Sequence, residues 1–163
     1  MGNILLLPTV GKIEPTSGNG SEAIRTRFSH NQEEARAGYY RVFLPDYNVK
    51  VELTATARVG LQRYTFPKTA EAHVVFDLWH GLGNHPVEAM LTIENNHTVS
   101  GFRKEVADSC FDKAGVKEYY FVAEFSRPFD DTSGINLEGS HVGGMEARGR
   151  DVKAHFDYST KNG

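Results

Sequence analysis

The sequence predicts an all-β protein, built as an antiparallel β-sandwich with little helix. Three observations support this fold class. The run Val49–Val59 alternates strictly between apolar and polar side chains. About eight short strand-like runs are separated by glycine and proline, which is typical of sandwiches and barrels. Only two short segments favour helix, and no internal repeat of fixed period is visible.

Length and composition favour one folded domain. The chain has 163 residues, of which 39% are hydrophobic and 11% aromatic, enough to build a core. The formal net charge is −3 and no basic run is present, which argues against a nucleic acid as partner. No stretch approaches the roughly 18 apolar residues of a membrane span. The single cysteine, Cys110, excludes an internal disulfide.

The alternating run Val49–Val59 places every apolar side chain on one face, which indicates a long antiparallel strand with one buried face. Gly60 ends the pattern, and Leu61–Phe66 is predicted to be its partner strand. The remaining predicted strands are bounded by proline, glycine or asparagine turns: Tyr39–Leu44, Ala72–Trp79, Glu88–Glu94, Thr98–Arg103, Tyr119–Ser126 and Val152–Tyr158.

Three segments do not follow a strand pattern. Asn31–Ala37 and Asp108–Gly115 are each predicted to form one or two helical turns. Asp130–Arg150 is rich in glycine, aspartate and serine and has no period. A structureless run of roughly 20 residues is unusual inside a compact domain, so we expect a mobile or functional loop over 130–150.

Few side chains suggest chemistry. His80 and His85, with Asp77 nearby, come closest to a metal-ligand set, but glycines and a proline separate them and no cysteine joins them. We therefore predict no structural zinc. Trp79 and His80 end a strand beside a glycine-containing loop, where a tryptophan could stack on the apolar face of a sugar ring. Packing of Trp79 in the core is the favoured interpretation, and these two residues are the only candidate carbohydrate contacts.

Several runs of this sequence, in the same order, resemble the N-terminal domain of the glycoside hydrolase family 92 α-mannosidases. The runs are Gly2-Asn3-Ile4-Leu5-Leu6, Arg27-Phe28-Ser29-His30, Glu33-Glu34-Ala35, Gly38-Tyr39-Tyr40, Asp46-Tyr47, Lys50–Thr56, Arg58–Pro67, Gly101-Phe102-Arg103 and Tyr120–Phe129. Ala37 stands where the family usually has proline. Ordered matches over roughly two-thirds of the chain are far more specific than one short motif.

The resemblance implies a galactose-mutarotase-like β-sandwich, which in this bacterial family precedes a helical (α/α)-barrel. It implies calcium-dependent, exo-acting, inverting enzymes that remove terminal mannose from N-glycan-type glycans, with the general acid and base in the helical domain. We therefore expect residues 1–163 to be a single, truncated sandwich domain without the catalytic barrel. No catalytic, cofactor-binding or metal residue is assigned to it, and Ca²⁺ is expected only for the full-length parent.

The resulting expectation is a non-catalytic N-terminal part of an exo-acting, inverting α-1,2-mannosidase, inactive alone, that supports the catalytic domain and the substrate pocket. Its partners would be the helical domain and, through the parent, an α-mannoside glycan. The family resemblance suggests a periplasmic, surface or secreted location. Unpaired sheet edges predict self-association of the isolated chain. The alternatives are a stand-alone carbohydrate-binding module using Trp79 and the 130–150 loop, and a small mutarotase-like enzyme.

Overall fold

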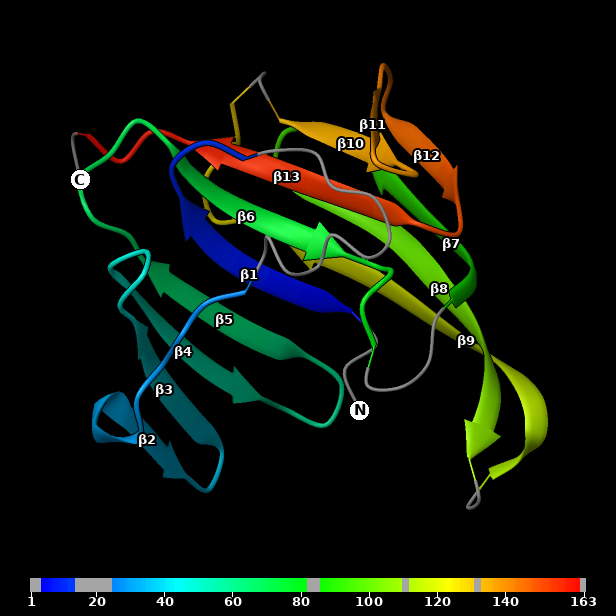
Figure 1. Cartoon of the computed structure of the whole chain (residues 1–163), viewed down its shortest axis with the longest axis horizontal. Helices are drawn as coiled ribbons and strands as arrows, with labels where there is room; N and C mark the ends of the chain where they lie inside the picture. The colour runs from blue at the N-terminus through cyan, green and yellow to red at the C-terminus, as the bar shows by residue number, and fades with distance from the viewer. Residues whose placement is uncertain (1–3, 14–24, 82–85, 110–111, 131–132, 162–163) are drawn as a thin grey trace.

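The computed structural model describes residues 4–13, 25–81, 86–109, 112–130 and 133–161. In these ranges the chain forms antiparallel strands, and the longest helical element is the three-residue 3-10 turn η2 (His30–Gln32) (Figure 1). The all-β prediction with little helix is therefore confirmed. None of the described helical segments is long and apolar enough to cross a membrane.

The strands form three sheets (Figure 1). The five-stranded sheet has the order β1 (Leu5–Val10), β6 (Ala72–Asp77), β13 (Val152–Tyr158), β10 (Gly134–Leu137) and β11 (Ser140–Val142). A four-stranded sheet has the order β12 (Glu146–Gly149), β7 (Pro86–Ile93), β8 (Thr98–Ser109) and β9 (Asp112–Glu124). A second four-stranded sheet has the order β2 (Glu33–Arg36), β3 (Tyr39–Leu44), β4 (Val49–Ala55) and β5 (Gly60–Thr65).

The main core lies between the five-stranded sheet and the sheet that contains β7, β8 and β9. Alternate side chains of β6 and β13, including Phe76 and Phe156, face Leu91 and Val99 of β7 and β8 in one buried cluster. Phe156 is fully buried, with ring centroids 5.5 Å from Phe76 and 4.8 Å from Phe129. The side chains that alternate along these strands therefore form the interface at which the two sheets pack into a sandwich.

The sheet β2-β3-β4-β5 has a smaller core of its own, and it lies beside β1 (Figure 1). Val49 and Val51 of β4 are buried there, and Leu7 of β1 packs against this cluster. Its neighbour Leu6 packs against the main core instead. Because successive side chains of a strand point to opposite faces, β1 connects the two cores.

The predicted strand over Val49–Val59 is shorter than expected, because it ends at Ala55. There the backbone N–H of Thr56 donates to the carbonyl of Val59 (2.8 Å), and the Thr56 hydroxyl accepts from the Val59 N–H (3.2 Å). This turn leads directly into β5, which confirms the predicted partner strand. Alternation alone does not reveal where the chain reverses, since the turn residues continue the same polar–apolar pattern.

The helix prediction for Asp108–Gly115 is wrong in the described residues, and the one for Asn31–Ala37 holds only for Asn31 and Gln32. The segment Asn31–Ala37 contains the end of η2 and then β2, where Glu33 pairs with Val42 of β3. The segment Asp108–Gly115 belongs to the β8–β9 hairpin, with residues 110–111 outside the described part. Pairing with a neighbouring strand satisfies more backbone groups than an isolated helical turn can, so tertiary context overrides the local preference.

The expected irregular segment over 130–150 is also wrong in its secondary structure, because it contains β10, β11 and β12. Glu138 and Gly139 form the tight turn between β10 and β11 with positive φ angles of 50° and 81°. Two consecutive left-handed residues are the signature of a two-residue hairpin turn. Strands of three or four residues are too short to give a periodic signal.

Candidate functional site

The turn that follows β6 contains Trp79 and His80, the two residues that the sequence analysis singled out as candidate carbohydrate contacts. Asp77, the last residue of β6, is fully buried. Its Oδ1 accepts hydrogen bonds from the backbone N–H groups of Trp79 (2.8 Å) and His80 (2.9 Å). A carboxylate that accepts from the backbone two and three residues ahead stabilises a tight turn. Asp77 therefore sets the path of the chain through Trp79 and His80.

Arg103 approaches the same turn from β8 and is also fully buried. Its Nη1 donates to the backbone carbonyl of His80, and its Nη2 lies 3.3 Å from Oε2 of Glu105. Burial lowers the pKa of Arg103, while the negative charges of Glu105 and Asp77 act in the opposite direction. The guanidinium thus joins the turn to the Glu105 carboxylate inside the sandwich.

Trp79 is half-buried and lies outside the apolar core cluster of the described residues. The guanidinium carbon of Arg150 lies 5.8 Å from the centroid of its indole ring. This distance is within the range of a cation–π interaction. The structure therefore does not place Trp79 in the core, which was the favoured interpretation of the sequence.

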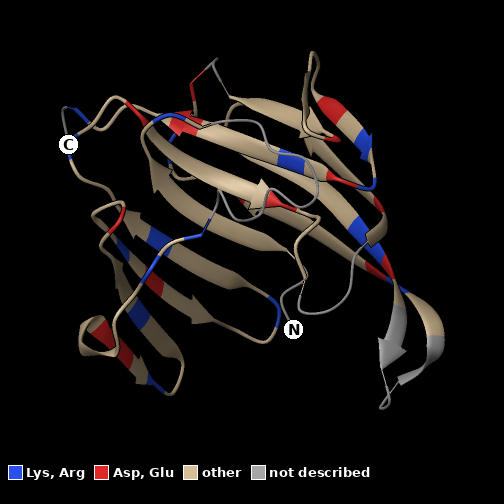
Figure 2. Cartoon of the chain, in the orientation of Figure 1, with Lys and Arg blue, Asp and Glu red and all other residues tan. Residues whose placement is uncertain are grey.

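A second buried ion pair lies on the adjacent strand. Lys153 of β13 is in register with Asp77, and its Nζ lies 3.0 Å from Oδ1 of Asp151. Figure 2 shows charged residues on β6, β8 and β13 towards the same end of the sandwich. Burying charges costs free energy that a purely apolar core avoids, so groups of this kind are candidates for a functional rather than a stabilising role.

A third polar group, on the paired strands β6 and β13, was not predicted from the sequence. Nδ1 of His73 lies 2.7 Å from Oδ1 of Asp157, its register partner, and Nε2 of His155 lies 4.0 Å from Oδ2 of Asp157. His73 and Asp157 are 84 residues apart in sequence. Only the pairing of β6 with β13 brings them together, which explains why sequence reasoning missed them.

No metal-ligand set converges in the described part of the chain, where no three His, Cys, Asp or Glu side chains are grouped to hold an ion. His85, a candidate with His80 and Asp77, lies outside the described residues. Asp77 instead directs one oxygen to two backbone N–H groups. The described residues at this turn therefore do not fit a calcium site.

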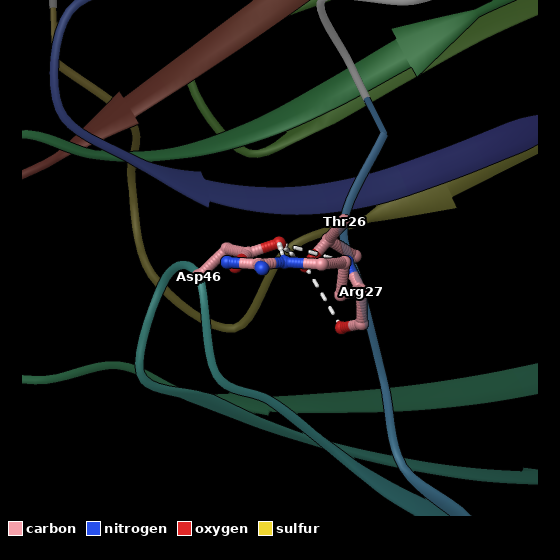
Figure 3. Close-up of polar contacts among 3 residues, drawn as sticks. All are labelled: Thr26, Arg27 and Asp46. Carbon is pink, nitrogen blue, oxygen red and sulfur yellow. Dashed lines mark hydrogen bonds and ion pairs between the residues drawn. The ribbon is translucent and has the colours of Figure 1, made fainter.

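The motif Arg27-Phe28-Ser29-His30 has a structural role in the described chain. Arg27 donates from Nε (3.0 Å) and Nη2 (2.7 Å) to Oδ1 of Asp46, and its backbone N–H donates to Oδ2 (2.8 Å) (Figure 3). The Thr26 hydroxyl also contacts this carboxylate (Figure 3). These bonds tie the segment before η2 to the turn between β3 and β4. Arg27 and Asp46 are thus engaged with each other.

This ion pair predicts a pH dependence of stability. The hydrogen bonds from Arg27 lower the pKa of Asp46 below its ordinary value of 3.8. A carboxyl whose folded-state pKa is lowered contributes stability above its unfolded-state pKa and loses it as the pH falls through the folded-state pKa. We therefore expect the urea midpoint to fall as the pH drops below 3.8, and Asp46→Asn to reduce that dependence. Equal pH dependence in both proteins would contradict this prediction.

The two-layered antiparallel sandwich, with an additional sheet packed beside it, places this chain in the class of β-sandwich domains. The particular family follows from a comparison with protein-family models. Residues 1–163 match the glycosyl hydrolase family 92 N-terminal domain, and the chain belongs to this family. The resemblance seen in the sequence is therefore confirmed. The sequence has no significant match among curated proteins.

Solved structures agree with this assignment. A family GH92 α-mannosidase from Bacteroides thetaiotaomicron is 26% identical, with a TM-score of 0.85 over 98% of this chain. The same enzyme in complex with mannoimidazole gives the same values. A GH92 family glycosyl hydrolase, ccman5, is 23% identical with a TM-score of 0.79 and supports the fold. This chain spans 22% of the length of each of these solved relatives.

Proposed function

We propose that this domain is the non-catalytic N-terminal part of an exo-acting, inverting α-1,2-mannosidase. In that enzyme it would support the catalytic domain and form part of the wall of the substrate pocket. The observation that carries the proposal is the match of 98% of this chain to a 22% portion of a known α-mannosidase. The calcium requirement and the acid and base carboxylates would then belong to the remaining polypeptide, and the enzyme would act in the periplasm, at the surface or outside the cell.

Two of the carboxylates, those of Glu88 and Glu118, are engaged in ion pairs that do not suit a general acid. Inverting hydrolysis requires two carboxyl groups about 6.5–9.5 Å apart that flank the substrate and a water molecule. In this chain the Glu88 carboxylate pairs with Arg148 (2.7 Å) and Glu118 pairs with Lys104 (3.0 Å). Hydrogen bonds from Arg148 and from Tyr120 are the main reason why the pKa values of Glu88 and Glu118 are lowered. A lowered pKa is the opposite of what a general acid needs.

A hydrolysis assay tests this proposal. We expect the purified chain to release no mannose from α-1,2-mannobiose, and the whole enzyme that contains it to do so with inversion at the anomeric carbon. Turnover by the isolated chain would contradict the non-catalytic role. Absence of turnover by the whole enzyme would contradict the assignment to an α-1,2-mannosidase.

One observation favours the alternative of a stand-alone carbohydrate-binding module. Trp79 is half-buried beside Arg150 instead of packing in the core, so an apolar ring face could meet a sugar. Calorimetric titration of the isolated chain with mannose decides between the two functions. Binding heat that disappears in Trp79→Ala would favour the module, whereas no heat would favour a domain that contributes to a pocket only within the enzyme.

We also propose that the isolated chain self-associates through β9. This strand is an edge of its sheet, and its side chains Tyr120 and Val122 are 73% and 68% exposed. A long edge strand with exposed apolar residues can pair with a second copy. We expect sedimentation velocity to show concentration-dependent association that Val122→Lys reduces. The control is Val59→Lys, because Val59 is similarly exposed but lies in the turn before β5.

A further inference from the structure

We propose that Asp77 and Arg103 act together as positioning residues that hold the backbone of Trp79 and His80, and thereby present the Trp79 indole to a sugar ring. The sugar as ligand rests on the proposed function. The claim that Asp77 and Arg103 hold this turn rests only on contacts within this chain.

Three backbone groups of the turn are held from two different sheets. Asp77, at the end of β6 in the five-stranded sheet, accepts from the N–H groups of Trp79 and His80. Arg103, on β8 in the facing sheet, donates to the carbonyl of His80. The peptide groups on both sides of His80 are therefore fixed relative to both layers of the sandwich. A turn held in this way has little freedom to change its backbone conformation.

The positioning pair is charged and completely buried, with an exposed fraction of 0% for both Asp77 and Arg103. A buried charge costs free energy that an apolar side chain of similar size avoids, because the charge is removed from water. The second oxygen of Asp77 has no hydrogen-bond partner among the described residues. Stability alone therefore does not account for this pair, whereas the fixed geometry of the turn does.

The geometry of Trp79 follows from this turn. The backbone of Trp79 is held by Asp77, while its ring lies near the guanidinium of Arg150, which follows β12. The backbone of Trp79 is thus fixed by the turn and its ring contacts a cation, yet the side chain stays partly exposed. A partly exposed aromatic ring on a fixed backbone is suited to stacking on the apolar face of a sugar, since less conformational freedom is lost on binding.

The test uses Trp79 itself, because it is the only tryptophan in the sequence and intrinsic fluorescence therefore reports on it alone. We expect Arg103→Met to raise the acrylamide quenching constant of the folded chain about twofold and to shift its emission to longer wavelength, as for a locally released segment. Arg103→Lys keeps the charge and should restore part of the original signal. Far-UV circular dichroism verifies that each variant is folded.

Two further variants make this result specific. Asp77→Asn keeps an oxygen that can accept from the turn but removes the charge, so it provides a folded variant with a smaller increase in quenching if Arg103→Met does not fold. Arg36→Met is the matched control, because Arg36 also pairs with a glutamate (3.7 Å) and its guanidinium carbon lies 4.7 Å from the centroid of an aromatic ring, but on β2, in the other four-stranded sheet. Unchanged quenching in folded Arg103→Met or Asp77→Asn would overturn the proposal.

The role in sugar recognition is tested in the whole enzyme with α-1,2-mannobiose. We expect Arg103→Met and Trp79→Ala each to raise KM about tenfold, roughly the effect of losing one aromatic contact, with little change in kcat. Increased quenching without a change in KM would overturn the positioning role. If the unmodified enzyme does not cleave mannosides, the proposed function fails, and the fluorescence result still decides whether the pair holds the turn.

Discussion

Replacement of Phe156 by alanine is expected to lower the free energy of unfolding by about 3–5 kcal/mol, the usual cost of deleting a buried aromatic ring. Phe156 is fully buried and is in contact with the rings of Phe76, Phe125 and Phe129. These residues come from β6, β13 and the segment after β9, so the cavity would open where both sheets meet. Urea denaturation followed by circular dichroism measures the change.

The matched control for this cavity is Val122→Ala on the outer surface of β9. Val122 is largely exposed, and surface substitutions of this kind usually change stability by about 0.5 kcal/mol or less. A loss below about 1 kcal/mol for Phe156→Ala would mean that the two sheets do not share a close-packed core.

Substitution of Gly101 by alanine is expected to cost about 1–3 kcal/mol through overpacking. Gly101 lies in β8 and pairs with Leu91 and with Phe121 of the flanking strands. An added Cβ would clash with the backbone carbonyl of Met90 and would lie 2.9 Å from Cζ of Phe121. A backbone carbonyl within a sheet cannot move aside without disturbing its strand, so the strain is not easily relieved.

The control is Gly60→Ala at the start of β5, where an added Cβ has no heavy atom within 4 Å. There alanine should be neutral or stabilising by about 0.4–1 kcal/mol, because it restricts the unfolded chain. Thermal or urea unfolding of the two variants gives the comparison. Equal stability changes would contradict the close approach at Gly101.

The long strands could be predicted from the sequence, and the short ones could not. Tyr39–Leu44 and Val152–Tyr158 have the predicted bounds, because aromatic and β-branched residues end there at clear turn signals. The strand β1, by contrast, starts with a run of leucines that has no alternation. Leu6 and Leu7 are both packed, since β1 lies between two cores, so the period-two signal is absent.

The candidate site likewise contains residues that could be predicted from the sequence and residues that could not. Trp79 and His80 could be noted because they are adjacent and were predicted at the end of a strand, although β6 ends at Asp77 and both lie in the turn that follows. Arg103 could not be associated with them, because it lies on another sheet and its burial contradicts the usual exposure of arginine. The pair formed by His73 and Asp157 could not be predicted from the sequence either, since it depends on the register of β6 and β13.

The sequence by itself determined the all-β class, the positions of the regular strands and membership of a glycosidase family, because alternation and ordered motifs are local properties of the chain. Only the tertiary structure decided which strands are neighbours, where charges are buried and which backbone groups Asp77 and Arg103 hold. These features depend on contacts between residues far apart in sequence, and their free energy appears only when the sheets have packed against each other.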